Sequence, residues 1–156
     1  MQLALATMQE LLTEKIHTRT AKVGVIGLGY VGLPLAVEFA NAGFSVTGID
    51  VQASKVAELN AGRSYIQDVP TETVRQHVES GHLRASTDFS VIADLDTVNI
   101  AVPTPLRKTK DPDMSFVVVA AERVAEYMHP GMLIILESTT YPGTTEELLL
   151  PMFEKR

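Results

Sequence analysis

The chain has 156 residues, enough for one domain with a single substantial core, and 46% of them are hydrophobic against 21% charged, a balance typical of globular proteins. The formal net charge of -6 argues against nucleic acid or an anionic membrane as a partner, because both require a basic surface. The absence of cysteine excludes disulfides, thiolate metal sites and a cysteine nucleophile within this chain, and the residue content favours a cytoplasmic protein. The apolar runs are too short to span a bilayer, and the four histidines show no spacing with carboxylates that predicts a metal site.

Residues 1–20 are predicted to form a helical extension outside the main domain. Leu5, Met8, Leu12 and Ile16 recur at the spacing of one helix face. The polar face lacks the basic residues of a membrane-surface helix. We therefore expect this helix to pack on the surface of the domain or on a partner subunit.

From residue 21 onward, short apolar runs alternate with longer amphipathic ones, which indicates repeated strand–helix units and a parallel sheet. Strands are expected at 22–26, 45–50, 83–86, 97–102 and 132–137; helices at 31–42, 54–60, 71–80, 115–127 and 144–150; and a helical turn at 88–93. Ser54 and Ser115 are expected to cap the helices that begin with them, and Gly43 to end the first helix of the domain.

These elements predict an α/β fold: a Rossmann-type doubly wound, mainly parallel sheet with helices on both faces, forming a single domain over residues 21–156.

A glycine-rich turn joins the first predicted strand of this domain to the helix that follows it. Its sequence is Gly27-Leu28-Gly29-Tyr30-Val31-Gly32, a G-x-G-x-x-G motif. The first glycine permits the tight turn, the second lets a pyrophosphate approach the backbone, and the third lets the helix pack closely on the strand. Free N–H groups at the helix N-terminus favour phosphate. The alternative is a glycine-rich turn without a ligand.

Asp50 supplies the second half of a dinucleotide-binding pattern. It ends the second strand about twenty residues after the motif, where a carboxylate hydrogen-bonds the adenosine ribose. The same charge repels a 2′-phosphate, and no arginine follows it directly, so the pattern predicts NAD and not NADP. Lys55 lies one helical turn into the next helix, where it either pairs with Asp50, faces the ribose or is a solvated surface lysine.

Two further segments follow predicted strands at the edge of the sheet where ligands bind in open α/β folds. Val102-Pro103-Thr104-Pro105 is expected to flank the nicotinamide half of the cofactor, or to be a rigid turn without ligand contact. Glu137-Ser138-Thr139-Thr140-Tyr141-Pro142-Gly143 groups a carboxylate with hydroxyls, which either position a water or substrate hydroxyl, or cap the helix that begins near Thr144.

These same segments resemble a known family. Val25-Ile26-Gly27-Leu28-Gly29-Tyr30-Val31-Gly32-Leu33-Pro34 is similar to the opening motif of the UDP-glucose/GDP-mannose dehydrogenase family, and the segments at 102–105 and 137–145 match the next two family blocks in order and spacing. The last block, together with Pro112-Asp113-Met114-Ser115, most resembles the bacterial UDP-N-acetylhexosamine 6-dehydrogenase branch. The resemblance covers residues 21–156.

This resemblance implies oxidation of the C6 hydroxymethyl of a nucleotide sugar to a carboxylate with two NAD, for polysaccharide biosynthesis. It implies that Tyr30, Val31, Asp50, Lys55, Thr104 and Thr139 contact NAD, and that Thr139 also lies near the reacting carbon as a catalytic polar helper. With the residues placed by the strand-end pattern, the expected NAD-binding set is Gly27, Leu28, Gly29, Tyr30, Val31, Gly32, Asp50, Lys55, Val102, Pro103, Thr104, Ser138 and Thr139. The role of Glu137 stays open.

The family also uses segments that this sequence lacks. Its members form covalent intermediates on a cysteine, bind the nucleotide of the sugar with a second domain, and dimerise through a connecting helix. We therefore expect the chain to hold NAD, to meet a nucleotide sugar only together with the missing part, and to be inactive alone. One alternative is a stand-alone NAD-sensing module, against which the segments at 102–105 and 137–143 argue. The other is the first domain of a hydroxyacid-type or phosphogluconate-type dehydrogenase, against which the segment at 137–143 argues.

Overall fold

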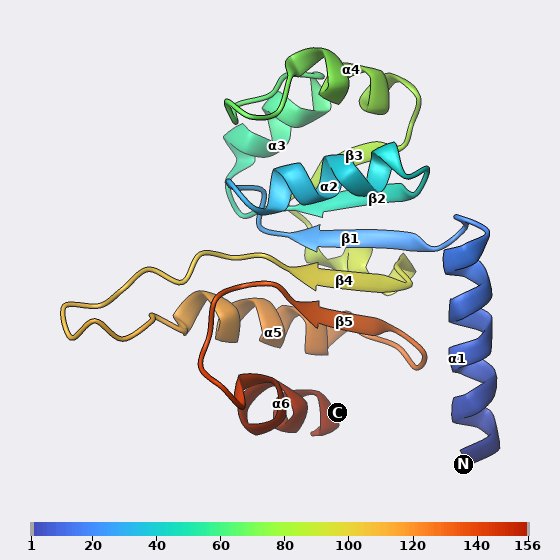
Figure 1. Cartoon of the computed structure of the whole chain (residues 1–156), viewed down its shortest axis with the longest axis vertical. Helices are drawn as coiled ribbons and strands as arrows, with labels where there is room; N and C mark the ends of the chain where they lie inside the picture. The colour runs from blue at the N-terminus through green and yellow to red at the C-terminus, as the bar shows by residue number, and fades with distance from the viewer. Residues whose placement is uncertain (1, 156) are drawn as a thin grey trace.

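A computed structural model describes residues 2–155, and their side chains from residue 7 onward. The strands are β1 (Lys22–Ile26), β2 (Ser45–Ile49), β3 (Leu83–Ser86), β4 (Thr97–Ile100) and β5 (Leu133–Leu136). All pair in parallel, in one five-stranded sheet of order β3-β2-β1-β4-β5 (Figure 1). The chain first adds strands on one side of β1 and then on the other, so the topological switch point lies between β1 and β4. The predicted Rossmann-type fold is confirmed.

Helices cover both faces of this sheet. The helical elements of the described residues are α1 (Gln2–His17), α2 (Gly32–Asn41), α3 (Ala53–Asn60), α4 (Thr71–Glu79), the 3-10 helix η1 (Phe89–Asp94), α5 (Ser115–Tyr127), the π-helical turn η2 (Thr145–Leu149) and α6 (Leu150–Glu154). Figure 1 shows α2, α3 and α4 grouped on the side of β1, β2 and β3, with α5 and α6 beside β4 and β5. This arrangement follows from the opposite directions in which the two halves of the sheet are wound.

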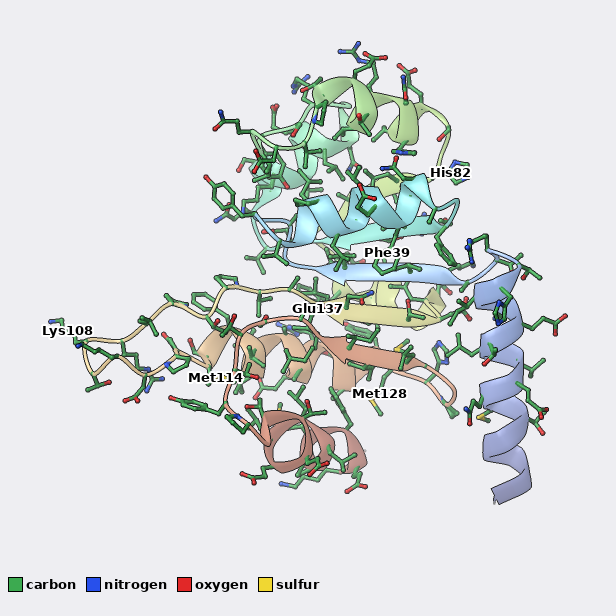
Figure 2. The ribbon with its side chains drawn as sticks, viewed as in Figure 1. Phe39, His82, Lys108, Met114, Met128 and Glu137 are labelled. Carbon is green, nitrogen blue, oxygen red and sulfur yellow. The ribbon has the colours of Figure 1, made fainter. Side chains whose placement is uncertain are left out.

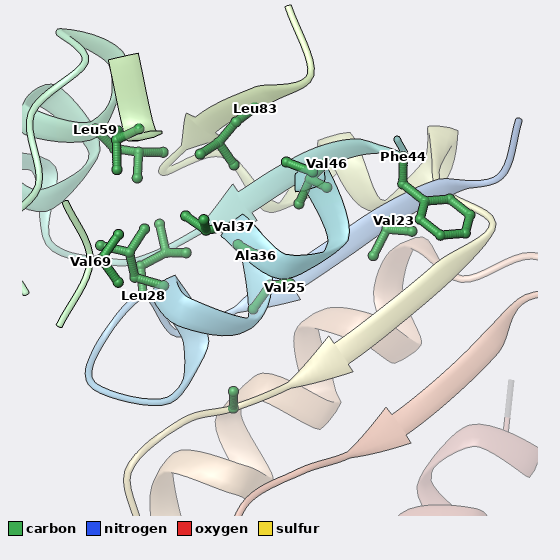
Figure 3. Packing of buried hydrophobic residues seen from close by; sticks show 14 of the residues in the cluster. Val23, Val25, Leu28, Ala36, Val37, Phe44, Val46, Leu59, Val69 and Leu83 are labelled. Carbon is green, nitrogen blue, oxygen red and sulfur yellow. The ribbon is translucent and has the colours of Figure 1, made fainter. Parts of the chain in front are cut away.

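The alternation of side chains along the strands divides the interior into two main clusters. Val23 and Val25 of β1 face the cluster that includes α2, whereas Ile26 and Ile49 belong to the cluster that includes α5. Figure 3 shows part of the first cluster. Burial of β1, β2 and β4 on both faces explains the mainly apolar runs that predicted these three strands.

The ends of several elements differ from the sequence-based expectation. Ser54 and Ser115 are not N-caps: Gln52 and Met114 occupy those positions, and neither forms a side-chain cap. At α5 the carboxylate of Asp113 accepts the Ser115 amide at 3.0 Å, so a residue two positions earlier serves the helix start. The helix expected at 144–150 is a π-helical turn that continues as α6. Gly43 does follow α2, with φ of 93°.

Helix α1 confirms the predicted N-terminal helix and lies across the amino ends of the strands, at the edge opposite the glycine turn (Figure 1). Ile16 packs against the first cluster, and Lys15 forms an ion pair with Asp96 at 2.7 Å. Leu11 is 55% exposed, whereas Met8 lies beside Gly131, where a Cβ would be 3.6 Å from Met8 Cβ. The side chain of Leu5 lies outside the described side chains. Within residues 2–155, no helix is long and apolar enough to cross a membrane.

Candidate cofactor site

The glycine turn between β1 and α2 has no space for a side chain at two positions. Gly27 has φ of 91°, and a Cβ there would lie 2.6 Å from the carbonyl oxygen of Ala101. A Cβ on Gly32 would overlap the carbonyl oxygen of Gly27, so α2 starts in direct contact with the turn. Around Gly29, no atom lies within 4 Å of such a Cβ. The steric roles predicted for Gly27 and Gly32 are therefore present, and Gly29 borders open space.

Backbone donors are available where this turn meets α2. The Leu33 amide donates to the carbonyl oxygen of Gly29 at 3.1 Å. Among the hydrogen bonds of residues 2–155, none uses the amides of Gly29 or Tyr30. The side chains of Tyr30 and Val31 are 83% and 60% exposed. Free amides at a helix N-terminus favour a negatively charged ligand, because they add to the partial positive charge of the helix dipole.

Asp50 lies directly after β2, buried against the same turn. One carboxylate oxygen accepts the Leu28 amide at 2.9 Å, and the other accepts the Gln52 amide at 2.9 Å. Of the alternatives for Lys55, pairing is observed, since its ammonium lies 3.7 Å from Asp50 Oδ2. Two carboxylate oxygens carry about four acceptor positions, so these contacts leave capacity for ribose hydroxyls.

The three strand-end segments meet in one cleft of about 390 Å³ at the carboxyl edge of the sheet. Apart from Gly32, which lies beneath the turn, every residue predicted to bind the cofactor lines it: Gly27, Leu28, Gly29, Tyr30, Val31, Asp50, Lys55, Val102, Pro103, Thr104, Ser138 and Thr139. The sequence thus predicted which segments come together. That these residues contact a cofactor stays a prediction.

The segment after β5 does not offer all of its hydroxyls to the cleft. Ser138 Oγ donates to the carbonyl oxygen of Val102 at 2.7 Å, which ties together the segments that follow β4 and β5. Thr144 Oγ1 donates to the Tyr141 carbonyl at 2.7 Å, so it stabilises the turn before η2. Thr139 and Glu137 are exposed and line the cleft, and Figure 2 shows Glu137 at the carboxyl end of β5.

An apolar pocket of about 410 Å³, which the sequence reasoning missed, adjoins this cleft and shares Asp50 and Lys55 with it. Val51 and Phe89 line it together with Phe116 and Val119 of α5, which are 47% and 53% exposed. Apolar residues three apart at the start of a predicted helix were the available signal, because they share a face. An apolar slot next to a carboxylate suits an aromatic base attached to a ribose.

Tyr65, also missed from the sequence, contacts the turn from the segment between α3 and α4. Its hydroxyl donates to the carbonyl oxygen of Leu28 at 2.7 Å. Burial raises the pKa of Tyr65, and the nearby charge of Asp50 raises it further, so the hydroxyl keeps its proton well into the alkaline range. No spacing rule marks a lone tyrosine in a loop, so only the structure identifies this contact.

Comparisons with known proteins agree with this geometry. Residues 21–156 match the model of the UDP-glucose/GDP-mannose dehydrogenase family, NAD binding domain. The chain is 38% identical over 135 residues to UDP-N-acetyl-D-glucosamine 6-dehydrogenase of Salmonella typhi, covering 86% of this chain and 31% of that protein. It is 40% identical over 137 residues to UDP-N-acetyl-D-mannosamine dehydrogenase of Escherichia coli (strain K12), covering 87% and 32%. The expected likeness to the UDP-N-acetylhexosamine branch is confirmed, and the chain spans about a third of the length of these relatives.

Solved structures give the same result. A ternary complex of GDP-mannose dehydrogenase from Pseudomonas aeruginosa superposes with a TM-score of 0.81 at 29% identity, over 85% of this chain and 32% of that one. The NDP-N-acetyl-D-galactosaminuronic acid dehydrogenase of Methanosarcina mazei Go1 gives 0.80 at 36% identity, over 92% and 33%. The expectation of NAD as the cofactor is confirmed by the family match. The chain therefore belongs to the UDP-glucose/GDP-mannose dehydrogenase family, and residues 21–156 are its NAD-binding domain.

Proposed function

We propose that this chain holds NAD as the hydride acceptor in a dehydrogenase that oxidises the C6 hydroxymethyl of a UDP-N-acetylhexosamine. The observation that carries the proposal is the single cleft in which the glycine turn, Asp50 and the segments after β4 and β5 meet. A cofactor that spans a topological switch point contacts both halves of the sheet. The relatives named for oxidation of such sugars support this substrate class.

The cleft suggests how NAD lies across the sheet. The apolar pocket beside Val51 and Phe116 takes the adenine, and Asp50 accepts from the hydroxyls of the adenosine ribose. The free amides of Gly29 and Tyr30 receive the pyrophosphate. The nicotinamide then extends toward Thr104 and Thr139, which line the far part of the cleft.

In this arrangement Thr139 is the residue of this chain closest to the chemistry. We assign it the role of a polar helper that hydrogen-bonds the reacting hydroxymethyl, while NAD accepts the hydride. Holding the sugar against the nicotinamide requires groups beyond this cleft, since orientation of both reactants is what makes hydride transfer fast. We therefore propose a division into a helical extension (1–20) and an NAD-binding domain (21–156), with substrate binding, the catalytic cysteine and dimerisation supplied by segments outside this sequence. A cytoplasmic location, which the composition favours, is part of the same proposal.

Calorimetric titration of the purified chain with NAD and with NADP tests the proposal. We expect NAD to bind at least about tenfold more tightly, because the Asp50 carboxylate repels a 2′-phosphate and costs its binding more than about 1.4 kcal/mol. Equal affinity for the two dinucleotides would contradict the role given to Asp50. Incubation with NAD and UDP-N-acetylglucosamine is expected to yield no NADH, and NADH formation would contradict the need for further segments.

A further inference from the structure

The peptide that follows Leu28 is held on three sides. The Leu28 amide, just before this peptide, donates to Asp50 at 2.9 Å, and the Leu28 carbonyl oxygen accepts the Tyr65 hydroxyl at 2.7 Å. The Leu28 side chain is fully buried against β2, where a Cβ on Gly48 would lie 2.7 Å from Leu28 Cδ2. Asp50 and the packing of Leu28 belong to the dinucleotide pattern, but the Tyr65 contact comes from a segment outside it.

This contact fixes the direction of the amide that follows. The carbonyl of Leu28 and the N–H of Gly29 belong to one trans peptide, in which the two groups point in opposite directions. Since the carbonyl is directed at Tyr65, the Gly29 N–H is directed away from it. Gly29 lines the cleft, and its amide donates to no acceptor within residues 2–155.

The segment that carries Tyr65 is itself firmly placed. Ile66 and Val69 are buried in the same cluster as Leu28, and Figure 3 shows Val69 beside Leu28. The Ser64 amide donates to Thr71 Oγ1 at 3.1 Å, which joins the segment to the start of α4. A donor mounted on a packed segment holds its acceptor in place, whereas a mobile donor would follow the movements of the turn.

We propose that Tyr65 is a positioning residue that orients the Gly29 amide toward the cofactor's pyrophosphate. The inference rests on the proposed binding mode, in which this amide receives the pyrophosphate. It assigns no catalytic contact to Tyr65. Without the hydroxyl, the Leu28 carbonyl loses the hydrogen bond that sets its direction, so orienting the Gly29 amide costs part of the free energy of dinucleotide binding.

The test compares Tyr65→Phe with the wild-type chain and with Tyr127→Phe, which removes a hydroxyl at the end of α5. Titrations use NAD, ADP-ribose and adenosine at a temperature at which all three proteins are folded. Loss of one neutral hydrogen bond is expected to weaken NAD and ADP-ribose roughly three- to tenfold in Tyr65→Phe. Adenosine lacks the pyrophosphate, so its affinity is expected to stay unchanged, as are all three affinities in Tyr127→Phe.

A second measurement needs no ligand. In nitrogen–proton NMR spectra of the free proteins, the Gly29 amide resonance is expected to shift and to exchange faster with solvent in Tyr65→Phe only. Unchanged affinity for NAD in Tyr65→Phe would overturn the inference and leave the proposed function intact. An equal loss for adenosine would also overturn it, since it would indicate general damage to the site. A wild-type chain that does not bind NAD would contradict both the inference and the proposed function.

Discussion

At the scale of single residues, Asp50 is expected both to hold the glycine turn in place and to select NAD over NADP. Its carboxylate accepts the amides of Leu28 and Gln52, and in the proposed binding mode its charge faces the 2′ position of the adenosine ribose. Asp50→Asn keeps the shape of the side chain but removes its charge. The new side-chain NH2 replaces one acceptor oxygen, so one of the two backbone amides loses its hydrogen bond. We expect unfolding free energy to fall by about 1–3 kcal/mol, the cost of an unsatisfied buried group.

The same variant is expected to bind NAD about tenfold less tightly and to lose most of the preference over NADP, because an amide neither attracts ribose hydroxyls as strongly nor repels phosphate. Urea unfolding and titration with both dinucleotides measure the two effects. Asp94→Asn, which neutralises an exposed carboxylate of η1, is the matched control and should change neither. A variant that kept the full preference for NAD would show that the selectivity lies elsewhere.

The residues that the sequence predicted and those that it missed differ in what positions them at the site. Gly27, Gly32 and Asp50 belong to a pattern of fixed spacing within one strand–turn–helix unit, so the chain itself sets their geometry. Tyr65 and Phe116 reach the site through tertiary packing, from segments whose local sequence carries no such spacing. Ser138 lines the cleft as expected, and its contact with a cofactor stays a prediction; that its hydroxyl donates to Val102 could not be foreseen without knowing how β4 and β5 pair.

At the scale of elements, α1 is attached to the domain through Asp96, which precedes β4. Burial alone would raise the pKa of Asp96, but hydrogen bonds from Lys15 and the Lys22 amide, together with the Lys15 charge, hold that pKa below its usual value. A lowered pKa in the folded state stabilises the protein above the unfolded value of about 3.9, and this stabilisation is lost as the pH falls through the folded value.

We therefore expect Lys15→Met to lower the unfolding free energy by about 1 kcal/mol or less at neutral pH, the usual range for a partly exposed ion pair. At a pH below the folded pKa of Asp96 the carboxyl is protonated in both proteins, and the difference should disappear. Urea unfolding at both pH values measures this, with Arg123→Met as a control that breaks an exposed pair within α5. An undiminished difference in acid would mean that Lys15 acts by packing and not through the charge of Asp96.

Element types were predicted more accurately than element ends, for a physical reason. All five strands were predicted; β1, β2 and β4 are buried along nearly their whole length, so apolar composition marks them strongly, whereas the edge strand β3 is only partly buried. Helix starts depend on the backbone of the residues just before the first turn, and the serines at 54 and 115 offered plausible caps that the structure does not use. The π-helical turn at Thr145–Leu149 has no sequence signature comparable to a helical period.

At the scale of the whole molecule, the cleft joins two halves that have largely separate cores. One cluster centres on α2 and the first three strands, and the other on α5, β4 and the far faces of β1 and β2. In the proposed binding mode, a dinucleotide across the switch point contacts the glycine turn of the first half and Thr104 and Thr139 of the second, all of which line the cleft. Binding is therefore expected to stabilise the fold as a unit and not one half alone.

Thermal unfolding with increasing NAD tests this expectation. A ligand at a hundredfold excess over its Kd stabilises the native state by about 2.7 kcal/mol. For a domain of this size, that corresponds to a rise in Tm of roughly 5–10 °C. The rise should appear equally in signals from both halves, for example tryptophan fluorescence from Phe44→Trp and from Phe153→Trp, since each residue belongs to a different cluster. NADP at the same concentration should raise Tm much less, and a rise confined to one reporter would contradict a cofactor that bridges the two halves.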